Sequence, residues 1–137
     1  VITRGAYILS EPSEVGLKKA AKAVIIATGS EVQLALAARE ALEAEGVGAR
    51  VVSMPCVEWF DQQPADYRDS VLPPSVTARV SVEAGIAQGW WKYLGTSGRA
   101  VSLEHFGASA AGPKLFEEFG ITPVAVAAAV RASMADA

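Results

Sequence analysis

The chain has 137 residues, of which 51% are hydrophobic and 20% charged, and its formal net charge is -3. This length fits one domain with a single core. Lys and Arg do not cluster as they do in nucleic-acid binders, and the longest apolar run is far shorter than a bilayer requires. We therefore expect one globular domain over residues 1–137, with neither nucleic acid nor a membrane as partner.

Cys56 is the single cysteine, so an internal disulfide cannot form, and the first residues lack the pattern of a secretion signal. A reducing, cytoplasmic location fits these features best. The chain begins with Val1 rather than methionine, which fits an excised piece of a longer protein as well as a trimmed native one.

Strand-length apolar runs alternate with helical patterns along the chain. The first run, Gly5 to Leu9, leads into a polar loop, and the continuously apolar Ala23 to Ala27 is typical of a strand covered on both faces. Soon after it, Ser30 is placed to cap a helix whose apolar residues recur at helical spacing. Gly46 is expected to end that helix.

The second half continues the same alternation. A strand is predicted at Ala49 to Met54, followed by short helical turns between Val57 and Val71. Apolar and polar residues alternate from Val76 to Glu83, which predicts a strand with one better-buried face. The remaining predicted elements are an aromatic-rich helix at Ile86 to Leu94, a strand at Arg99 to Leu103, a helix at Lys114 to Phe119, and a final helix capped by Thr122 with Val126, Val130 and Met134 on one stripe.

This order of elements predicts a three-layer α/β/α sandwich with a mostly parallel sheet, because parallel neighbours need crossover connections. The ends of successive strands then meet at one edge, where open α/β folds usually bind ligands. The residues that this edge would collect are Thr28, Ser30, Ser53, Cys56, Glu83, Glu104 and His105. We take Thr28, Ser30, Ser53, Glu83 and His105 as a candidate anion-binding or regulatory edge.

A catalytic role for this edge is weakly supported. The sequence contains no Gly-x-Ser-x-Gly motif, so a serine hydrolase is disfavoured and His105 is expected to be structural. Glu31 already places a negative charge at the helix start, so capping is favoured over anion binding there. One histidine and one cysteine do not suffice for a zinc site. We therefore predict no catalytic, cofactor-binding or metal-binding residue.

Trp90 and Trp91 are adjacent in the predicted aromatic-rich helix, so both cannot face the same core. Large aromatic side chains are enriched at protein interfaces. A partner surface at this pair is as well supported as packing under a loop.

Several segments in order resemble the C-terminal, or third, domain of bacterial transketolases. They are Arg4-Gly5-Ala6-Tyr7-Ile8-Leu9, Ala27-Thr28-Gly29-Ser30-Glu31-Val32, Ala49-Arg50-Val51-Val52-Ser53-Met54-Pro55-Cys56 followed by Phe60-Asp61, Tyr67-Arg68-Asp69-Ser70-Val71-Leu72-Pro73, and Val82-Glu83-Ala84-Gly85-Ile86-Ala87. Phe106-Gly107-Ala108-Ser109-Ala110 and Phe119-Gly120-Ile121-Thr122 extend the set. Each segment is weakly specific alone, whereas the ordered set spans almost the whole chain. Cys56-Val57-Glu58-Trp59 and Trp90-Trp91 resemble actinobacterial members in particular.

The resemblance implies a mixed five-stranded sheet whose first strand is antiparallel, and Tyr7 to Ser10 suits that strand. It divides the chain into an edge strand and lead-in loop at residues 1–22 and an α/β core at 23–137. Transketolases transfer a two-carbon ketol unit between sugar phosphates with thiamine diphosphate and a divalent metal, Mg²⁺ or Ca²⁺. In the family these groups lie on two preceding domains and across a homodimer interface. The resemblance therefore implies a non-catalytic domain that supports the dimer or regulates the enzyme, with those domains and the homodimer mate as partners.

Two other interpretations stay open at the level of sequence. A related thiamine enzyme, such as deoxyxylulose-phosphate synthase or a 2-oxo-acid dehydrogenase β subunit, shares this domain, although the path from Ser53 to Asp61 favours transketolase. A free-standing α/β module that binds a small ligand at the strand edge is the second alternative.

Overall fold

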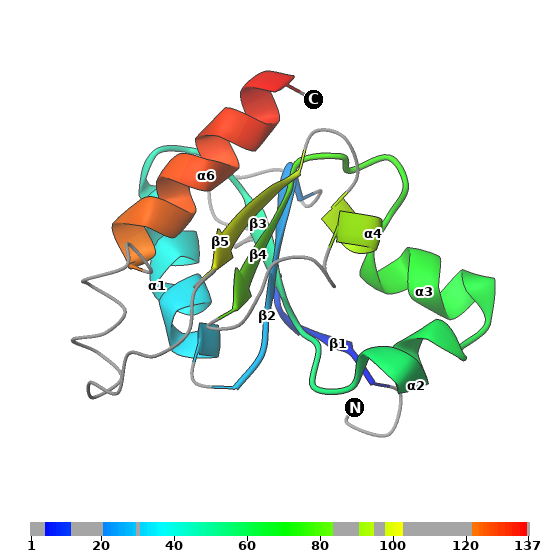
Figure 1. Ribbon diagram of the computed structural model, residues 1–137. Coiled ribbons are helices and arrows are strands. Elements are labelled where there is room, and N and C mark those ends of the chain that lie inside the picture. Colours follow the sequence, from blue (N-terminus) through cyan, green and yellow to red (C-terminus); the bar gives the residue numbers. More distant parts are fainter. Residues whose placement is uncertain are drawn as a thin grey trace.

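The computed structural model describes residues 5–11, 21–29, 31–83, 91–94, 98–102 and 122–136. Within them a sheet lies between two layers of helices, with α1 (Glu31–Ala44) and α6 (Pro123–Asp136) on one face. The other face carries α2 (Val57–Asp61), α3 (Ala65–Val71) and α4 (Trp91–Leu94), as Figure 1 shows. The predicted three-layer α/β/α sandwich is confirmed.

The sheet contains five strands in the order β1-β3-β2-β4-β5. They are β1 (Tyr7–Ser10), β2 (Ala23–Ala27), β3 (Ala49–Ser53), β4 (Arg79–Glu83) and β5 (Arg99–Ser102). β1 runs antiparallel to β3, and the other neighbouring pairs are parallel. This arrangement confirms the mixed five-stranded sheet with an antiparallel first strand that the resemblance implied.

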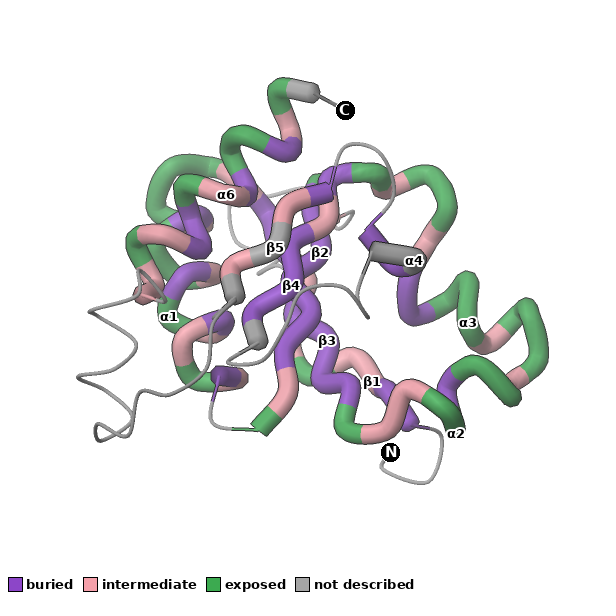
Figure 2. Tube along the Cα trace, viewed as in Figure 1, coloured by how far each residue is buried: buried purple, intermediate pink, exposed green. Residues whose placement is uncertain are grey.

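The central strand β2 explains why its sequence is continuously apolar. All five of its residues are fully buried, and alternate side chains point to opposite faces of the sheet. Ala23, Ile25 and Ala27 pack under α1 and α6. Val24 and Ile26 pack under α2, α3 and α4. Figure 2 shows β2 as a buried segment through the middle of the molecule.

Two helix ends follow the local signals in the sequence. Gly46 has φ 85°, its N–H donates to the Glu43 carbonyl at 2.9 Å, and the Val47 N–H donates to the Leu42 carbonyl at 2.9 Å. This hydrogen-bond pattern ends α1 in the way that glycine at a helix C-terminus favours. At the start of α6, the Ala125 N–H donates to the Thr122 hydroxyl at 3.1 Å, so the predicted cap is confirmed.

Two predicted strand boundaries were wrong by a few residues. β4 begins at Arg79 rather than Val76, because the Val76 N–H donates to the Pro73 carbonyl at 3.0 Å and closes a turn there. β1 covers Tyr7 to Ser10, as expected from the resemblance, whereas Gly5 in the apolar run before it has a φ of 84° that does not fit a strand. Met54 lies just past the end of β3, although its N–H still donates to the Ala27 carbonyl at 3.0 Å.

Other predictions fall partly outside the described residues. α4 covers the last four residues of the predicted helix at Ile86 to Leu94, and the rest of that helix lies outside them. Leu103 and the predicted helix at Lys114 to Phe119 also lie outside them. In the part of the chain that the structure describes, no helix is both long and apolar enough to span a bilayer.

Candidate functional site

The carboxyl edge of the sheet brings together three of the predicted edge residues. Ala27 pairs with Ser53 on one side and with Val82 on the other. Thr28 therefore follows the end of β2 between Ser53 and Glu83, the last residues of β3 and β4. The Ser53 side chain contributes little surface, because this residue is 8% exposed. Ser30, Glu104 and His105 lie outside the described residues. The role of this edge as an anion or regulatory site stays a prediction.

The start of α1 at this edge is organised by backbone contacts. The Glu31 N–H donates to the Thr28 carbonyl at 3.2 Å, and the Val32 N–H donates to the Gly29 carbonyl at 3.3 Å. Glu31 itself is 5% exposed, so a carboxylate is held in the first turn of the helix. An anion arriving here would meet the buried carboxylate of Glu31 and two backbone N–H groups that already donate to carbonyl groups. The geometry favours a structural role for this turn.

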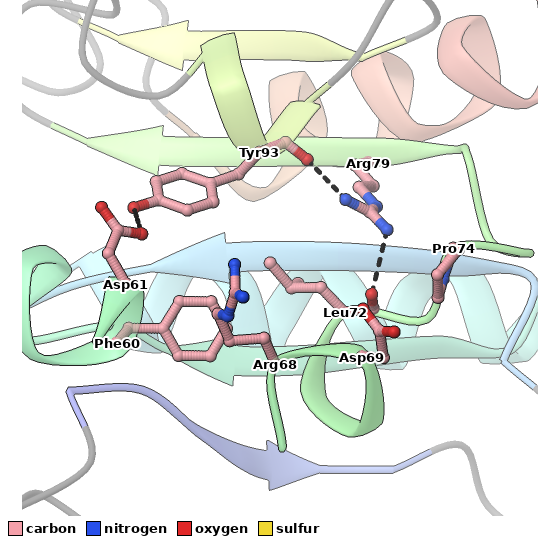
Figure 3. A pocket seen from close by; sticks show the side chains of 8 residues that line it. All are labelled: Phe60, Asp61, Arg68, Asp69, Leu72, Pro74, Arg79 and Tyr93. Carbon is pink, nitrogen blue, oxygen red and sulfur yellow. Dashed lines mark hydrogen bonds between the residues drawn. The ribbon is translucent and has the colours of Figure 1, made fainter. Parts of the chain in front are cut away.

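A pocket of about 450 Å³ lies elsewhere, between α2, α3, α4 and the amino end of β4. Sequence reasoning did not find it. Figure 3 shows the side chains that line it, which come from successive segments between Phe60 and Tyr93. They are Phe60, Asp61, Arg68, Asp69, Leu72, Pro74, Arg79 and Tyr93.

Arg79 forms one wall of the pocket and joins three segments of backbone. Its Nε donates to the Val76 carbonyl at 3.0 Å and its Nη1 to the Tyr93 carbonyl at 2.8 Å. Its Nη2 donates to the carbonyls of Leu72, at 3.1 Å, and Pro73, at 2.8 Å. Burial lowers the pKa of this guanidinium, and the nearby Asp69 carboxylate opposes that shift. Arg79 on β4 therefore holds the end of α3, and α4, against the sheet through these hydrogen bonds.

Tyr93 forms a second wall with its ring and its hydroxyl. The hydroxyl donates to Asp61 Oδ1 at 2.7 Å, and the ring meets the Phe60 ring edge-on, with centroids 6.1 Å apart. Burial raises the pKa of Tyr93 well above its ordinary value, and the hydrogen bond to Asp61 raises it further. The phenol thus stays protonated at neutral pH and does not serve as a base.

Arg68 is the cation of the pocket with unused donors. Its Nε donates to the Gln63 carbonyl at 3.0 Å, which fixes the orientation of the guanidinium. Its two terminal amino groups have no hydrogen-bond partner among the described residues. In Figure 3 the side chain points into the pocket, toward the rings of Phe60 and Tyr93.

These contacts make the pocket suited to binding rather than to catalysis. None of the lining residues is a serine, cysteine, lysine or histidine that could act as a nucleophile beside a base. Its floor is apolar, with Phe60 2% and Leu72 6% exposed, and the Arg68 guanidinium faces that floor. An acidic group with an apolar neighbour would satisfy both features.

The described residues contain no group of three or more His, Cys, Asp and Glu side chains that could hold a metal ion. Cys56 is half-buried, and its Sγ lies 3.5 Å from Glu58 Oε2. Trp91 begins α4, whereas Trp90 lies outside the described residues, so the proposed interface at this pair stays a prediction.

The strand order, with one antiparallel edge strand and helices on both faces of the sheet, defines a mixed-sheet α/β domain. The family model of the transketolase-like TK C-terminal domain matches residues 5–122, and the chain belongs to this family. The motifs that carried the resemblance in the sequence analysis thus identified the family correctly.

The particular relatives are transketolases. The chain is 56% identical over 128 residues to the transketolase of Mycobacterium leprae, covering 93% of this chain and 18% of that protein. It is 55% identical over 121 residues to transketolase 1 of Escherichia coli K12, and this match covers 88% of this chain and 18% of that protein. Among solved structures, transketolase from Leishmania mexicana superposes with a TM-score of 0.83 and 42% identity, covering 98% of this chain and 18% of that one. The chain therefore spans less than a fifth of the length of these relatives.

Proposed function

We propose that this chain is the C-terminal domain of a transketolase and serves that enzyme without contributing catalytic groups. The single observation that carries the proposal is the family match over residues 5–122 together with the transketolase relatives. In the full protein, ketol transfer between sugar phosphates would use thiamine diphosphate and a divalent metal bound by the preceding domains. The domain would belong to a cytoplasmic homodimer and would support its assembly.

The non-catalytic role is supported by the chemistry of the described residues. In the pocket, the protonated Tyr93 hydroxyl donates to Asp61, and the Arg79 guanidinium donates to backbone carbonyl groups. The charged side chains that line the described pocket thus hold helices together, and among them Arg68 alone has N–H groups without a hydrogen-bond partner in the described residues. A cofactor with a diphosphate group would need several such cations and a metal.

A domain exchange tests the proposal. The C-terminal region of Mycobacterium leprae transketolase, which this chain matches at 56% identity, is replaced by residues 1–137. We expect the chimera to form the dimer and to transfer ketol units at a rate within about tenfold of the parent, because a supporting domain leaves the reacting groups unchanged. The parent enzyme lacking its C-terminal region is the matched control.

The isolated chain provides the second arm of this test. Isothermal titration with thiamine diphosphate and Mg²⁺ is expected to give no binding heat. Saturable micromolar binding to the isolated chain would contradict the non-catalytic assignment. A chimera that folds and dimerises but has no transferase activity would contradict the assignment to transketolase.

A further inference from the structure

The pocket between α2, α3, α4 and β4 combines an apolar floor with a charged rim. Its volume of about 450 Å³ falls within the range of about 300–1,000 Å³ that is typical of small-molecule sites. Phe60 and Leu72 are 2% and 6% exposed, and the Tyr93 ring, 6% exposed, stands beside them. The charged side chains that α2 and α3 contribute belong to exposed residues. A molecule with one polar end and one apolar end would therefore match the pocket.

Most of the charged groups that line the pocket already have partners. Two of the lining residues are acidic and two are basic. Asp61 accepts a hydrogen bond from the Tyr93 hydroxyl, and the Asp69 carboxylate interacts electrostatically with the Arg79 guanidinium. All three nitrogens of Arg79 donate to backbone carbonyl groups. These groups are therefore held by the fold, and each would have to give up an existing contact to bind a ligand.

Arg68 is the exception among these charges, because only part of its guanidinium is engaged. Its Nε donates to the Gln63 carbonyl at 3.0 Å, whereas its two terminal amino groups have no hydrogen-bond partner among the described residues. Figure 3 shows this side chain pointing into the pocket, toward the rings of Phe60 and Tyr93. A planar guanidinium offers two parallel N–H groups, which match the two oxygens of a carboxylate.

We propose that this pocket binds a small organic acid that carries one carboxylate and a compact aromatic or branched aliphatic group. The carboxylate pairs with the terminal amino groups of Arg68, and the apolar group packs on Phe60, Leu72 and Tyr93. The binding site extends the proposed function without depending on it, because it follows from the contacts of the pocket alone.

The charge balance of the pocket selects a ligand with a single negative charge. Two carboxylates and two guanidinium groups line it, so their formal charges cancel. A phosphate monoester or a diphosphate would bring further negative charge close to Asp61 and Asp69, which raises the electrostatic cost of binding. One carboxylate needs only the one guanidinium that has unpaired N–H groups, and its apolar group would be removed from water by the rings.

Ligand-detected fluorine NMR with 4-fluorophenylacetate as the probe tests the proposal. The probe is titrated with the chain of residues 1–137, whose folding is checked by a cooperative melt, and with the chimera described above. We expect saturable binding with a Kd of about 1 mM or below in both proteins. The neutral analogue 4-fluorophenylacetamide has the same ring without the charge, and it should bind at least about tenfold more weakly.

Variants of Arg68 assign the binding to this side chain. Arg68→Gln should weaken the binding of 4-fluorophenylacetate by about tenfold, and Arg68→Lys should weaken it less, because lysine keeps the charge but not the paired N–H groups. Arg131→Gln is the matched control, since it removes an exposed guanidinium from α6 on the other face of the sheet. We expect this control to leave the affinity unchanged. Each variant is first shown to melt cooperatively at the temperature of the parent.

The outcomes distinguish this proposal from the proposed function. Absence of saturable binding to the folded chain, equal affinity for the acid and the amide, or an unchanged affinity in Arg68→Gln would each overturn the ligand site. Binding to the chain that is lost in an active, dimeric chimera would retain the transketolase assignment and overturn the site in the assembled enzyme. A chimera that binds the probe through Arg68 but transfers no ketol units would support the site and refute the proposed function.

Discussion

Replacing Gly5 by alanine should destabilise the domain far more than the same replacement at Gly46. Both glycines have nearly the same backbone conformation, with φ of 84° and 85°. Alanine at such an angle costs about 1–2 kcal/mol through its own backbone. At Gly46 an added Cβ would meet nothing within 4 Å, whereas at Gly5 it would overlap the Cys56 carbonyl oxygen and the Phe60 amide nitrogen. Gly46→Ala is therefore the matched control for conformation alone.

The size of the difference follows from the contact with α2. To admit a methyl group, the chain at Gly5, just before β1, must move away from α2, and overpacking of this kind typically costs about 1–3 kcal/mol. The hydrogen bond from the Cys56 N–H to the Gly5 carbonyl, 3.0 Å long, would be weakened as well. We thus expect Gly5→Ala to cost about 2–5 kcal/mol in total, against about 1–2 kcal/mol for Gly46→Ala.

Urea unfolding followed by tryptophan fluorescence and circular dichroism measures both variants. The free energy of unfolding is obtained by linear extrapolation, with the slope compared between variants to check that the unfolded states are alike. Equal losses at Gly5 and Gly46 would show that the contact between Gly5 and α2 does not constrain the chain, which would refute the steric argument.

Three further predictions concern the whole domain and two buried side chains. The isolated chain should unfold cooperatively in a circular-dichroism melt; a broad melt with dye binding would show that other domains are needed for the fold. The raised pKa of Tyr93 means that the folded state holds the phenol proton more tightly than the unfolded state does. The free energy of unfolding should therefore be constant below pH of about 10 and fall above it, with a smaller fall in Tyr93→Phe. Urea unfolding at several pH values measures this difference. Ser81 Oγ is fully buried without a hydrogen-bond partner in the described chain, so Ser81→Ala should be neutral or stabilising by up to about 1 kcal/mol. Ser133 is equally buried but has a partner, so Ser133→Ala should destabilise the domain in the same urea assay.

The fold was largely predictable because its signals are local. A continuously apolar β2 predicts a strand covered on both faces, Gly46 predicts a helix end, and Thr122 predicts a cap. The antiparallel direction of β1 came from the family resemblance, since nothing in the residues 7–10 encodes strand direction. The start of β4 was missed because the alternation from Val76 continues through a turn that the Pro73 carbonyl closes.

The pocket could not be predicted because no local pattern encodes it. Its walls come from α2, α3, the start of β4 and α4, which are brought together by the tertiary fold. The segments with Phe60-Asp61 and Tyr67-Arg68-Asp69 were noted as family motifs, without a structural reason. The structure supplies that reason, since Tyr67 anchors Ala6 and Asp61 accepts from Tyr93.

The antiparallel pairing of β1 with β3 also bears on how the domain forms during synthesis. Tyr7 pairs with Ser53, so β1 leaves the ribosome before its partner strand exists. At about 5–20 residues per second the wait lasts a few seconds. During that interval the first strand has no sheet to join and is open to wrong partners, including the same segment of a neighbouring nascent chain. The bulge at Leu9 interrupts the regular edge of this strand, which makes such mispairing less favourable.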